Sequence, residues 1–421
     1  MLSLPAMIHP VAGRLMDIEA ARSAVLDRCA PLGAEEVAVD DALERVLAED
    51  VTSADPVPPF DNSAMDGYAV RAADTAHAAP DRPVALDVIG ESRAGAPAAS
   101  GIEEAQAITI STGAALPSGA DAVVRLEDAD ARDGSIVVIA PVQPGRDVRR
   151  AGEDVRGGQL VLGHGAVLGP SELGVLASVG RAGVRCAARP RVSVLTTGDE
   201  LVGPAGELGP GQIRDANAHS IPALARMAGA NVADVAHTGD DANATREAIR
   251  GALRADVAVV CGGVSVGRHD HVRPAFAELG VDEVFWGLAL RPGKPTWFGA
   301  AADGTLAFGL PGNPVSAMVT FILLIRPALL ALSGASPERY RASAVLDEPY
   351  TKAPGRAHFV RVRLRVRDDG WHARPTKEQG SHVLTSMLGA DAFAIMPADH
   401  GDMTAGERVA IELLSPRLSG S

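Results

Sequence analysis

Two different spacings of hydrophobic and polar positions divide the chain. Apolar residues recur at helical spacing over residues 16–29, which predicts a helix there, and a second short helix is predicted near 41–47. The stretch 57–70 is typical of a loop that leads into a strand. Between residues 84 and 139 the apolar runs are short and broken by Gly and Pro. They predict a small β-rich module with strands at 107–110, 121–126 and 135–139.

The spacing changes at Pro190, after a helix predicted at 171–179. From residue 191 onward, continuous runs of Val, Ala and Leu alternate with helical segments. This alternation predicts a parallel sheet with right-handed crossovers. The predicted strands are 192–196, 232–237, 257–261 and 284–290, and the helices between them lie near 218–227, 244–253 and 272–279.

A long helix and a second β region complete the pattern. The apolar stretch 314–332 predicts a helix. After Pro337 strand-like alternation returns at 358–366, 392–396 and 408–413. We therefore expect a multidomain protein of the α/β class with β-rich modules, comprising a central parallel-sheet α/β domain and a small C-terminal β domain.

Composition narrows the class of protein. A chain of 421 residues exceeds what one hydrophobic core normally supports, so about two to four domains are expected. With 47% hydrophobic residues the chain is too apolar to be disordered. The formal net charge of −14 disfavours nucleic-acid binding, which needs a basic surface, but it leaves room for a local basic pocket that binds a small anion.

Cysteine usage and apolar segments indicate the compartment. The chain has three widely separated cysteines, none of them in a CxxC pair: Cys29, Cys186 and Cys261. A disulfide framework and a cysteine zinc site are therefore not expected. The N-terminal segment lacks the pattern of a secretory signal. The most apolar segment, 315–332, contains Arg326 and Pro327, which is typical of a buried helix rather than a membrane span. We expect a cytoplasmic protein without membrane contact.

Chemically versatile residues follow the predicted strands of the α/β domain. In open parallel sheets, ligands bind beyond the carboxyl ends of the strands. At these positions the sequence has Thr-Thr-Gly-Asp-Glu at 196–200, Thr-Gly-Asp-Asp at 238–241, Cys-Gly-Gly-Val-Ser at 261–265 and Arg-Pro-Gly-Lys-Pro at 291–295. A later turn, Leu-Pro-Gly-Asn-Pro at 310–314, directly precedes a helix.

This set of residues is suited to a phosphorylated ligand and a divalent metal ion. Glycines let backbone N–H groups approach phosphate oxygens. Clustered carboxylates repel one another unless they bind a cation, and Mg²⁺ is commonly held by carboxylates together with substrate phosphates. The residues that follow the predicted strands therefore indicate a site for Mg²⁺ and a phosphorylated ligand at this edge of the sheet.

Each of these signals also has a plainer interpretation. A carboxylate after a strand is about as often a helix N-cap as a ligand. His269 and His271 would point in opposite directions from an extended segment, and the charges at 149–154 taken alone indicate a solvated surface. The patterns of dinucleotide folds, P-loop ATPases and serine hydrolases are absent from the sequence.

The C-terminal module contains several arginines, among them Arg356, Arg361 and Arg363. Arg361 and Arg363 share one face of a strand, so they could present a cationic patch to an oxyanion.

A set of short motifs occurs in a fixed order along the chain. The set includes Pro-Phe-Asp-Asn-Ser-Ala-Met-Asp-Gly-Tyr-Ala-Val at 59–70, Thr-Gly-Ala at 112–114, Arg-Ala-Gly-Glu-Asp at 150–154, Thr-Thr-Gly-Asp-Glu-Leu at 196–201, Gly-Gly-Val-Ser-Val-Gly at 262–267, Pro-Gly-Lys-Pro at 292–295, Leu-Pro-Gly-Asn-Pro-Val-Ser at 310–316 and Gly-Ser-His at 380–382. Together these motifs resemble the molybdopterin molybdenumtransferases, the family of MoeA and the gephyrin E domain. The resemblance spans nearly the whole chain.

The resemblance implies a transferase of molybdenum cofactor biosynthesis. Such an enzyme inserts molybdate into adenylylated molybdopterin, uses Mg²⁺, and releases AMP and molybdenum cofactor. The resemblance also implies a homodimer whose active site is shared between chains, with the upstream adenylyltransferase as a further candidate partner. Four subdomains would follow: a helical linker subdomain from 1–53 and 147–189, a β-rich subdomain at 54–146, a molybdopterin-binding α/β subdomain at 190–336 and a C-terminal β subdomain at 337–421.

The resemblance also assigns roles to residues, motif by motif. The implied catalytic residues are Asp66, Asp154, Glu200, Asp270 and Lys294. The implied metal ligands are Asp199, Glu200, Asp240 and Asp270. Molybdate or phosphate would be bound by Arg291, Lys294, Ser316, Arg361 and Ser381. Other substrate contacts would be Thr112, Asp199, Asp240, Gly262, Gly263, Ser265, Pro311 and Pro314. Three of these residues would reach the site from the partner chain: Asp66, Thr112 and Asp154.

The sequence departs from the family pattern at two basic positions. Arg291 stands where the family commonly has lysine, and another family lysine falls at Gly287. Two rival functions stay open at this point. One is the preceding reaction, ATP-dependent adenylylation of molybdopterin. The other is a non-catalytic scaffold that binds peptides, as the gephyrin E domain does.

Overall fold

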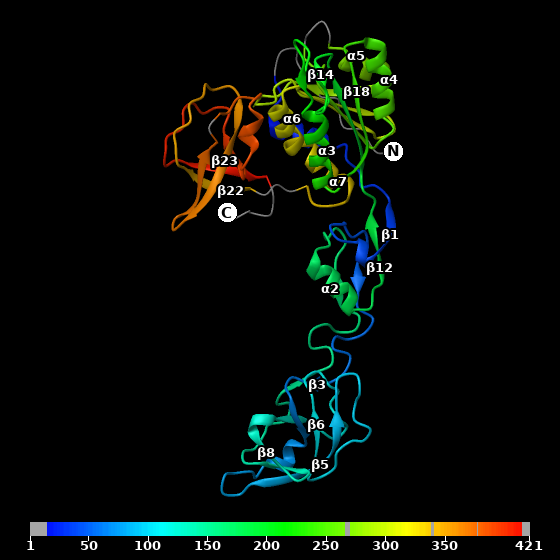
Figure 1. Ribbon diagram of the computed structural model, residues 1–421, viewed down its shortest axis with the longest axis vertical. Coiled ribbons are helices and arrows are strands. Elements are labelled where there is room, and N and C mark those ends of the chain that lie inside the picture. Colours follow the sequence, from blue (N-terminus) through cyan, green and yellow to red (C-terminus); the bar gives the residue numbers. More distant parts are fainter. Residues whose placement is uncertain (1–14, 266–269, 338–340, 377, 415–421) are drawn as a thin grey trace. The chain divides into compact units, whose positions relative to one another are not determined.

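The computed structural model of the chain describes residues 15–265, 270–337, 341–376 and 378–414 (Figure 1). The chain forms two compact units. The first comprises residues 1–35, 44–46 and 186–421, and the second comprises 36–43 and 47–185. The chain passes from one unit to the other within β1 (Ala34–Ala38) and β12 (Gly183–Ala187), which pair as a two-stranded sheet. The finer division into four subdomains remains a prediction.

A six-stranded sheet is the core of the second unit. Its order is β7-β4-β6-β5-β9-β8. The strands are β4 (Gly67–Val70), β5 (Val84–Ser92), β6 (Gln106–Ile110), β7 (Ala122–Arg125), β8 (Ala129–Arg132) and β9 (Ser135–Val138). Buried Val70, Leu86, Val124 and Ile136 hold the sheet together. The predicted β-rich module is confirmed, and β6, β7 and β9 lie within one residue of the strands expected, whereas β5 and β8 were not predicted.

The same unit contains further short elements. They are β2 (Val51–Thr52), β3 (Asn62–Ser63), β10 (Val148–Arg149), β11 (Leu160–Leu162), the 3-10 turns Val39–Asp41, Ala72–Thr75 and Leu126–Asp128, and the helix α2 (Pro170–Ser178). The helix predicted at 41–47 is wrong. Glu44 has a left-handed backbone with φ +61, and the Leu47 N–H donates to the carbonyl of Ala166, so the segment cannot continue as a helix.

The first unit contains a six-stranded α/β sheet in the order β16-β13-β17-β21-β20-β18. The strands are β13 (Arg191–Thr197), β16 (Asn231–Thr238), β17 (Val257–Cys261), β18 (Val281–Trp286), β20 (Trp297–Ala301) and β21 (Leu306–Leu310). The first four strands in the sheet order are parallel, and β20 is antiparallel to both of its neighbours. β18 therefore runs in the same direction as β21, and its carboxyl end lies at the same edge.

The prediction of a purely parallel sheet needs two corrections. The strand expected at 284–290 ends at Trp286, and β20 and β21 were not predicted. Both unpredicted strands have five residues, and a tight turn at Gly304 with φ +92 joins them. The two apolar runs around Asp303 and Gly304 are typical of a hairpin, which departs from the strand–helix alternation of the rest of the domain.

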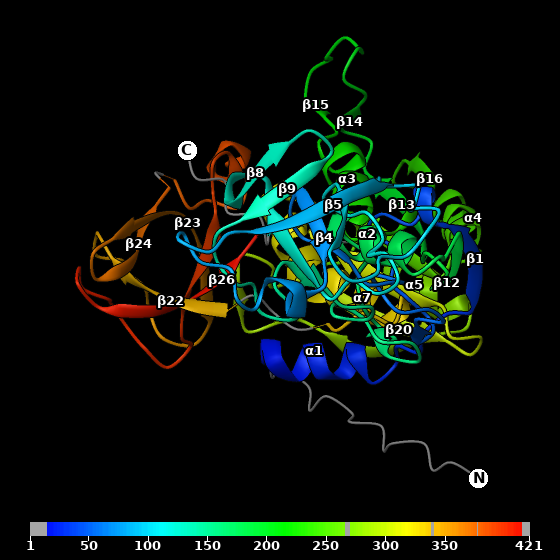
Figure 2. The same cartoon turned by 90° about the horizontal axis from the view of Figure 1, so that it is seen from below.

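Helices cover both faces of this sheet. One face is covered by α1 (Ile18–Leu26), α3 (Asn217–Met227) and the segment Pro314–Leu332, and the other by α4 (Ala242–Ala252) and α5 (Val272–Glu278). Successive residues of a strand point to opposite faces of the sheet. Val194 and Val259 pack against the helices α1 and α3 and the segment Pro314–Leu332, whereas Leu195 and Val260 pack against α4 and α5. A two-residue pairing of β14 (Leu201–Val202) with β15 (Ile213–Arg214) lies after β13 (Figure 2).

The helix predicted at 314–332 is continuous but not regular. α6 (Pro314–Thr320) passes through a π turn (Phe321–Ile325) into α7 (Arg326–Leu332). The π turn ends two residues before Pro327, whose ring would clash in a regular α-helix with the carbonyl four residues earlier, at Leu323 within the π turn. By length and composition this is the one stretch of the described chain that could cross a membrane. In the structure 78% of it is buried, as for the core helix of a globular domain.

A third six-stranded sheet forms the C-terminal β domain. Its order is β19-β23-β24-β22-β26-β25, and an additional pairing of β23 with β25 closes five of the strands into a barrel. The strands are β19 (Leu290–Arg291), β22 (Arg341–Leu346), β23 (Ala357–Arg367), β24 (Gly370–Pro375), β25 (Ala392–Met396) and β26 (Arg408–Leu413), with a 3-10 turn at Leu384–Met387. Val360, Val362 and Ile411 fill the interior. The predicted C-terminal β domain is confirmed.

One histidine of this barrel is held between two carboxylates. His372 Nδ1 lies 3.0 Å from Asp347 Oδ1, and its Nε2 lies 2.9 Å from Asp369 Oδ1. Both ring nitrogens can donate only when the ring is protonated. The hydrogen bond to Asp369, followed by the one to Asp347, raises the pKa of His372 above its usual value.

We expect this pair of contacts to make stability depend on pH. The stabilisation is complete below the pKa of an unfolded histidine, about 6.5, and is lost as the pH rises through the raised pKa of His372. The His372→Gln variant should therefore lie furthest below the unmodified chain in urea unfolding near about pH 5.5 and approach it near about pH 8.5. His77→Gln, at an exposed histidine of the other unit, is the control. If the difference in the free energy of unfolding between His372→Gln and the unmodified chain does not change with pH, His372 is not held in its protonated form by the two carboxylates.

Candidate functional site

A pocket of about 230 Å³ lies between the α/β sheet and the C-terminal barrel. The segment after β18 forms one wall, the turn before α6 forms another, and the loop after β24 forms the third. The lining residues are Leu290, Arg291, Pro292, Gly293, Lys294, Pro295, Pro311, Asn313, Ser316, Arg356, Gln379 and Ser381. Three cations and several neutral donors line it without a carboxylate, so the pocket is suited to an anion.

The chain reaches this pocket by leaving one sheet for the other. After Trp286 the N–H of Leu288 donates to the carbonyl of Lys294 at 2.9 Å, which closes a loop at the edge of the α/β sheet. At the tip of the loop β19 pairs in parallel with β23, matching Leu290 with Ala357 and Arg291 with His358. This pairing places Arg291 and Lys294 in the same pocket wall.

The loop requires glycine at position 293, where it turns back from β19 toward the α/β sheet. Gly293 has φ +119, and a Cβ there would lie 2.5 Å from Thr320 Cγ2 in α6. Gly287 has φ +87, and a Cβ there would lie 3.0 Å from Leu15 Cδ2. A lysine at this position, the alternative raised by the sequence, would be strained in this backbone.

Ser381 is tied to the start of α6. Asn313 Nδ2 donates to Ser381 Oγ at 3.2 Å, and the N–H of Val315 donates to the Ser381 carbonyl at 3.2 Å. The buried residue Ser316 lies in the next turn. The structure therefore brings together five residues predicted for anion or substrate binding: Arg291, Lys294, Pro311, Ser316 and Ser381.

Arg361 does not line the pocket but supports its wall. Its side chain is buried. Nη2 donates to the carbonyls of Glu378 and Gly380 at 3.3 and 3.2 Å, and Nε donates to Ser386 Oγ at 3.1 Å. Its main chain exchanges two further hydrogen bonds with the Gln379 side chain. Burial lowers the pKa of Arg361 to about 10, so the guanidinium is still charged at neutral pH.

The sequence prediction assigned no site role to four residues beside this pocket, although it noted Arg356 among the arginines of the C-terminal module. Arg356, Asn313 and Gln379 line it, and Asn313 and Gln379 flank predicted residues within the same short motifs. His358 lies opposite Arg291 in the β19–β23 pairing and is 3.2 Å from the Tyr350 hydroxyl. Burial, helped by Arg291, lowers the pKa of His358 to about 4, so this histidine adds no charge to the pocket at neutral pH.

Glycine turns and carboxylates occupy the neighbouring edge of the α/β sheet. A Cβ on Gly262 would lie 2.8 Å from the Thr197 carbonyl, and Gly263 has φ +63, so both positions need glycine. A Cβ on Gly312, between two pocket-lining residues, would lie 3.9 Å from Gly262 Cα, so the edge adjoins the pocket. Pro314, predicted to contact substrate, begins α6 there.

The predicted metal ligands are only partly brought together. Asp199 Oδ1 accepts a hydrogen bond from the Asp240 N–H at 3.1 Å, while Glu200 follows directly at the end of β13. Ser265 and Asp270 flank residues 266–269, and His269 lies outside the described residues. Within the described parts of the chain, no three His, Cys, Asp or Glu side chains form a group that could hold a metal ion.

The remaining predicted residues lie in the other compact unit. Asp66, directly before β4, accepts hydrogen bonds through Oδ1 from the Thr112 N–H at 2.7 Å and the Thr112 hydroxyl at 3.1 Å. Asp154 is exposed in the turn after β10. In the same turn Arg150 pairs with Asp61 at 2.6 Å. The N–H of Ala151 and, secondarily, Arg150 lower the pKa of Asp61. The unit thus presents fixed carboxylates on two neighbouring loops.

Three family descriptions match successive parts of the chain. Residues 16–180 match the MoeA N-terminal region (domain I and II), residues 193–331 match a probable molybdopterin-binding domain, and residues 343–414 match the MoeA C-terminal region (domain IV).

Curated relatives are similar over most of their length. The molybdopterin molybdenumtransferase of Haemophilus influenzae is 36% identical over 406 residues, covering 94% of this chain and 98% of the relative. The enzyme of Bacillus subtilis is 35% identical, with 90% of each chain covered. Molybdopterin molybdenumtransferase 2 of Mycobacterium tuberculosis is 38% identical, with 87% and 91% covered.

Solved structures agree with these relatives. Two crystal structures of the molybdopterin biosynthesis MoeA protein from Pyrococcus horikoshii match with TM-scores of 0.82 and 0.83 and sequence identities of 35% and 30%. The matches cover 96% and 95% of this chain and 100% of each neighbour.

Arg361 offers a test of how the pocket wall is held. Arg361→Met keeps the aliphatic length but removes three side-chain hydrogen bonds to residues 378–386. We expect a loss of about 1–3 kcal/mol in the free energy of unfolding. We also expect about tenfold weaker binding of sulfate, because Gln379 and Ser381 lose their support. Urea unfolding and calorimetric titration measure the two effects. Arg408→Met removes an exposed arginine from the same barrel as a control, and sulfate affinity equal in both variants would contradict the supporting role.

Proposed function

Since the chain belongs to the MoeA family of molybdopterin molybdenumtransferases, enzymes of molybdenum cofactor biosynthesis, we propose that it inserts molybdate into adenylylated molybdopterin and releases AMP and molybdenum cofactor. The observation that carries this proposal is the cationic pocket at the edge of the α/β sheet. The cytoplasm, predicted from the sequence, is the proposed location of the reaction.

The proposed molybdate site is the pocket around Lys294. Molybdate is a tetrahedral dianion, so it needs cations and hydroxyl donors on several sides. Lys294 and Arg291 supply charge from one wall and Arg356 from another, while Ser316 and Ser381 supply hydroxyls. Holding the anion in this way reduces its freedom to leave and orients it toward the neighbouring substrate.

The adenylylated pterin is proposed to lie along the adjacent sheet edge. Gly262 and Gly263 form a tight turn in which a Cβ would meet Thr197 and Val272, and the Gly262 N–H donates to the Leu310 carbonyl. The N–H of Gly263, at a positive φ in this turn, is the proposed donor to a phosphate oxygen. Asp199 and Asp240 stand at the ends of neighbouring strands and would face the phosphate-linked part of the substrate. The same edge meets the pocket through Gly312, so both substrates would be adjacent.

Magnesium is proposed to arrive with the phosphates of the substrate. The predicted ligands Asp199, Glu200, Asp240 and Asp270 offer only hard oxygen donors, which is the chemistry that Mg²⁺ prefers. The described residues form no complete protein cage, and Mg²⁺ commonly takes one or two carboxylates plus substrate phosphates. When bound, the ion would neutralise charge on the phosphate link to AMP.

A homodimer is proposed in which each site uses both chains. Asp66 and Asp154 belong to the compact unit that does not contain the cationic pocket. The carboxylate of Asp66 is held by two hydrogen bonds from Thr112, which leaves its second oxygen for a substrate group. The upstream adenylyltransferase remains a candidate partner that would deliver the adenylylated substrate.

Activity with defined components tests the reaction. We expect AMP release from adenylylated molybdopterin that requires molybdate and Mg²⁺ together, and that stops when either is left out or Mg²⁺ is removed with a chelator. Chromatography of AMP and of molybdenum cofactor provides the measurement. Absence of AMP with every component present would refute the proposal, and ATP consumption with non-adenylylated molybdopterin would instead favour the adenylyltransferase reaction.

Mixing two inactive variants tests the shared site. Lys294→Met and Asp66→Asn should each lower kcat/KM by about 100-fold. Lys294→Met removes a positive charge that would bind molybdate, and Asp66→Asn removes a carboxylate that would contact the substrate. Random mixed dimers of the two variants should recover about a quarter of the normal sites. Arg250→Met, at the end of α4 that lies away from this sheet edge, is a matched control with normal activity. If the mixture shows no recovery while each variant still forms dimers, the shared site is wrong.

A further inference from the structure

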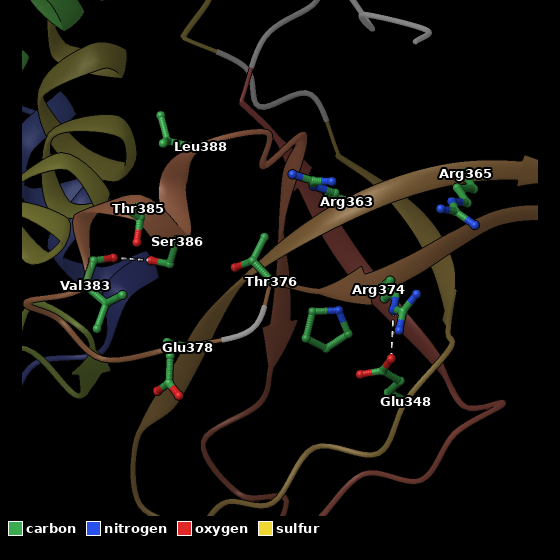
Figure 3. Close-up of a pocket in the computed structure, with 11 residues that line it drawn as sticks. Glu348, Arg363, Arg365, Arg374, Thr376, Glu378, Val383, Thr385, Ser386 and Leu388 are labelled. Carbon is green, nitrogen blue, oxygen red and sulfur yellow. Dashed lines mark hydrogen bonds and ion pairs between the residues drawn. The ribbon is translucent and has the colours of Figure 1, made fainter.

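A second, larger cavity lies within the C-terminal domain, outside the pocket around Lys294. Its volume is about 570 Å³, which is within the usual range for small-molecule sites. It lies between the β23–β24 pair and the segment around Leu384–Met387 (Figure 3). The lining residues are Glu348, Arg363, Arg365, Arg374, Pro375, Thr376, Glu378, Val383, Thr385, Ser386 and Leu388. None of them lines the first pocket.

Arginines give this cavity its cationic character. Arg374 is paired with Glu348 at 2.7 Å (Figure 3), whereas no carboxylate among the described residues is within ion-pair distance of Arg363 or Arg365. Arg363 lies directly opposite Arg374 across the β23–β24 pair. Like charges in opposed positions destabilise a sheet. Glu348 pairs with Arg374 and offsets part of this repulsion, and a bound anion would pair with Arg363.

The backbone makes room for one of these guanidinium groups. Gly389 has φ +68, and a Cβ there would lie 2.8 Å from Arg363 Nη2 and 3.1 Å from its Nε. Arg363 is therefore seated against a position where any side chain would displace it. Thr385 and Ser386 add hydroxyls on the facing segment, while Pro375, Val383 and Leu388 add an apolar surface.

We infer that this cavity binds a small organic phosphate, with the phosphate on Arg363 and Arg365 and the organic part against Val383 and Leu388. Two guanidinium groups without carboxylate partners offer more N–H donors than one carboxylate can accept. A phosphate monoester has three free oxygens and can accept hydrogen bonds from both groups. The apolar lining distinguishes an organic phosphate from the bare inorganic ion.

Titration of the full chain with phenyl phosphate tests this assignment. The titrations use full-length Lys294→Ala, so that anions bound in the first pocket contribute little heat. Phenyl phosphate should bind, and either Arg363→Ala or Arg365→Ala should weaken its binding by about tenfold or more. Arg408→Ala, which removes an exposed arginine from the same barrel, should leave it unchanged. Circular dichroism of each variant verifies that the barrel is folded.

Inorganic phosphate and benzoate test whether binding needs both the phosphate group and the organic ring. Inorganic phosphate should bind more weakly than phenyl phosphate, and Leu388→Ser should weaken binding of phenyl phosphate without changing binding of inorganic phosphate. Benzoate, which carries a carboxylate on the same ring, should bind more weakly than phenyl phosphate. The inference is overturned if benzoate binds equally well, if Arg363→Ala and Arg365→Ala bind phenyl phosphate as Arg408→Ala does, or if phenyl phosphate does not bind at millimolar concentration.

Discussion

The pairing of two residues, Leu290 and Arg291, with β23 is the contact on which the candidate site depends. It is a short piece of parallel ladder, yet it takes a loop of the α/β sheet into the C-terminal barrel. Without it, Lys294 would belong to a loop at the edge of one sheet, and Arg356 and Ser381 to a separate domain. With it, cations from both domains line one pocket of about 230 Å³. A local main-chain interaction therefore assembles a charge distribution that neither domain contains alone.

The buried side chain of Arg361 also holds a wall of this pocket, through hydrogen bonds rather than through strand pairing. A buried guanidinium loses hydration, which is why its pKa falls to about 10, and it is tolerated only when its donors are satisfied. Here carbonyls of the segment 378–386 accept them. That segment lines the pocket around Lys294 on one side and the larger cavity on the other. The arginine therefore fixes the wall that separates two anion-attracting spaces without facing either of them.

Sequence periodicity predicted the elements whose burial is regular. The strands β13, β16 and β17 and the helix Pro314–Leu332 have continuous or helical apolar patterns, and their predicted bounds agree with the structure to within about two residues. The hairpin of β20 and β21 was not predicted, although Asp303 and Gly304 between two apolar runs are typical of such a turn. The switch of 290–291 into another sheet was not predicted because it depends on a contact with residues 357–358, far along the chain. Motifs indicated which residues form the pocket. They could not show that Arg361 lies behind the wall, because periodicity gives the face of a strand and not what covers it.

Net charge and local charge have to be considered separately in this protein. A chain with a net charge of −14 repels anions at long range, so an anion site must depend on cations within a few ångströms, where solvent screening is weakest. Arg291, Lys294 and Arg356 meet this condition, because their pocket is lined by no carboxylate. Arg363 and Arg365 meet it less completely, since two carboxylates, Glu348 and Glu378, line the same cavity. The first pocket is therefore better suited to a compact dianion, while the second favours a ligand whose binding also uses apolar contact.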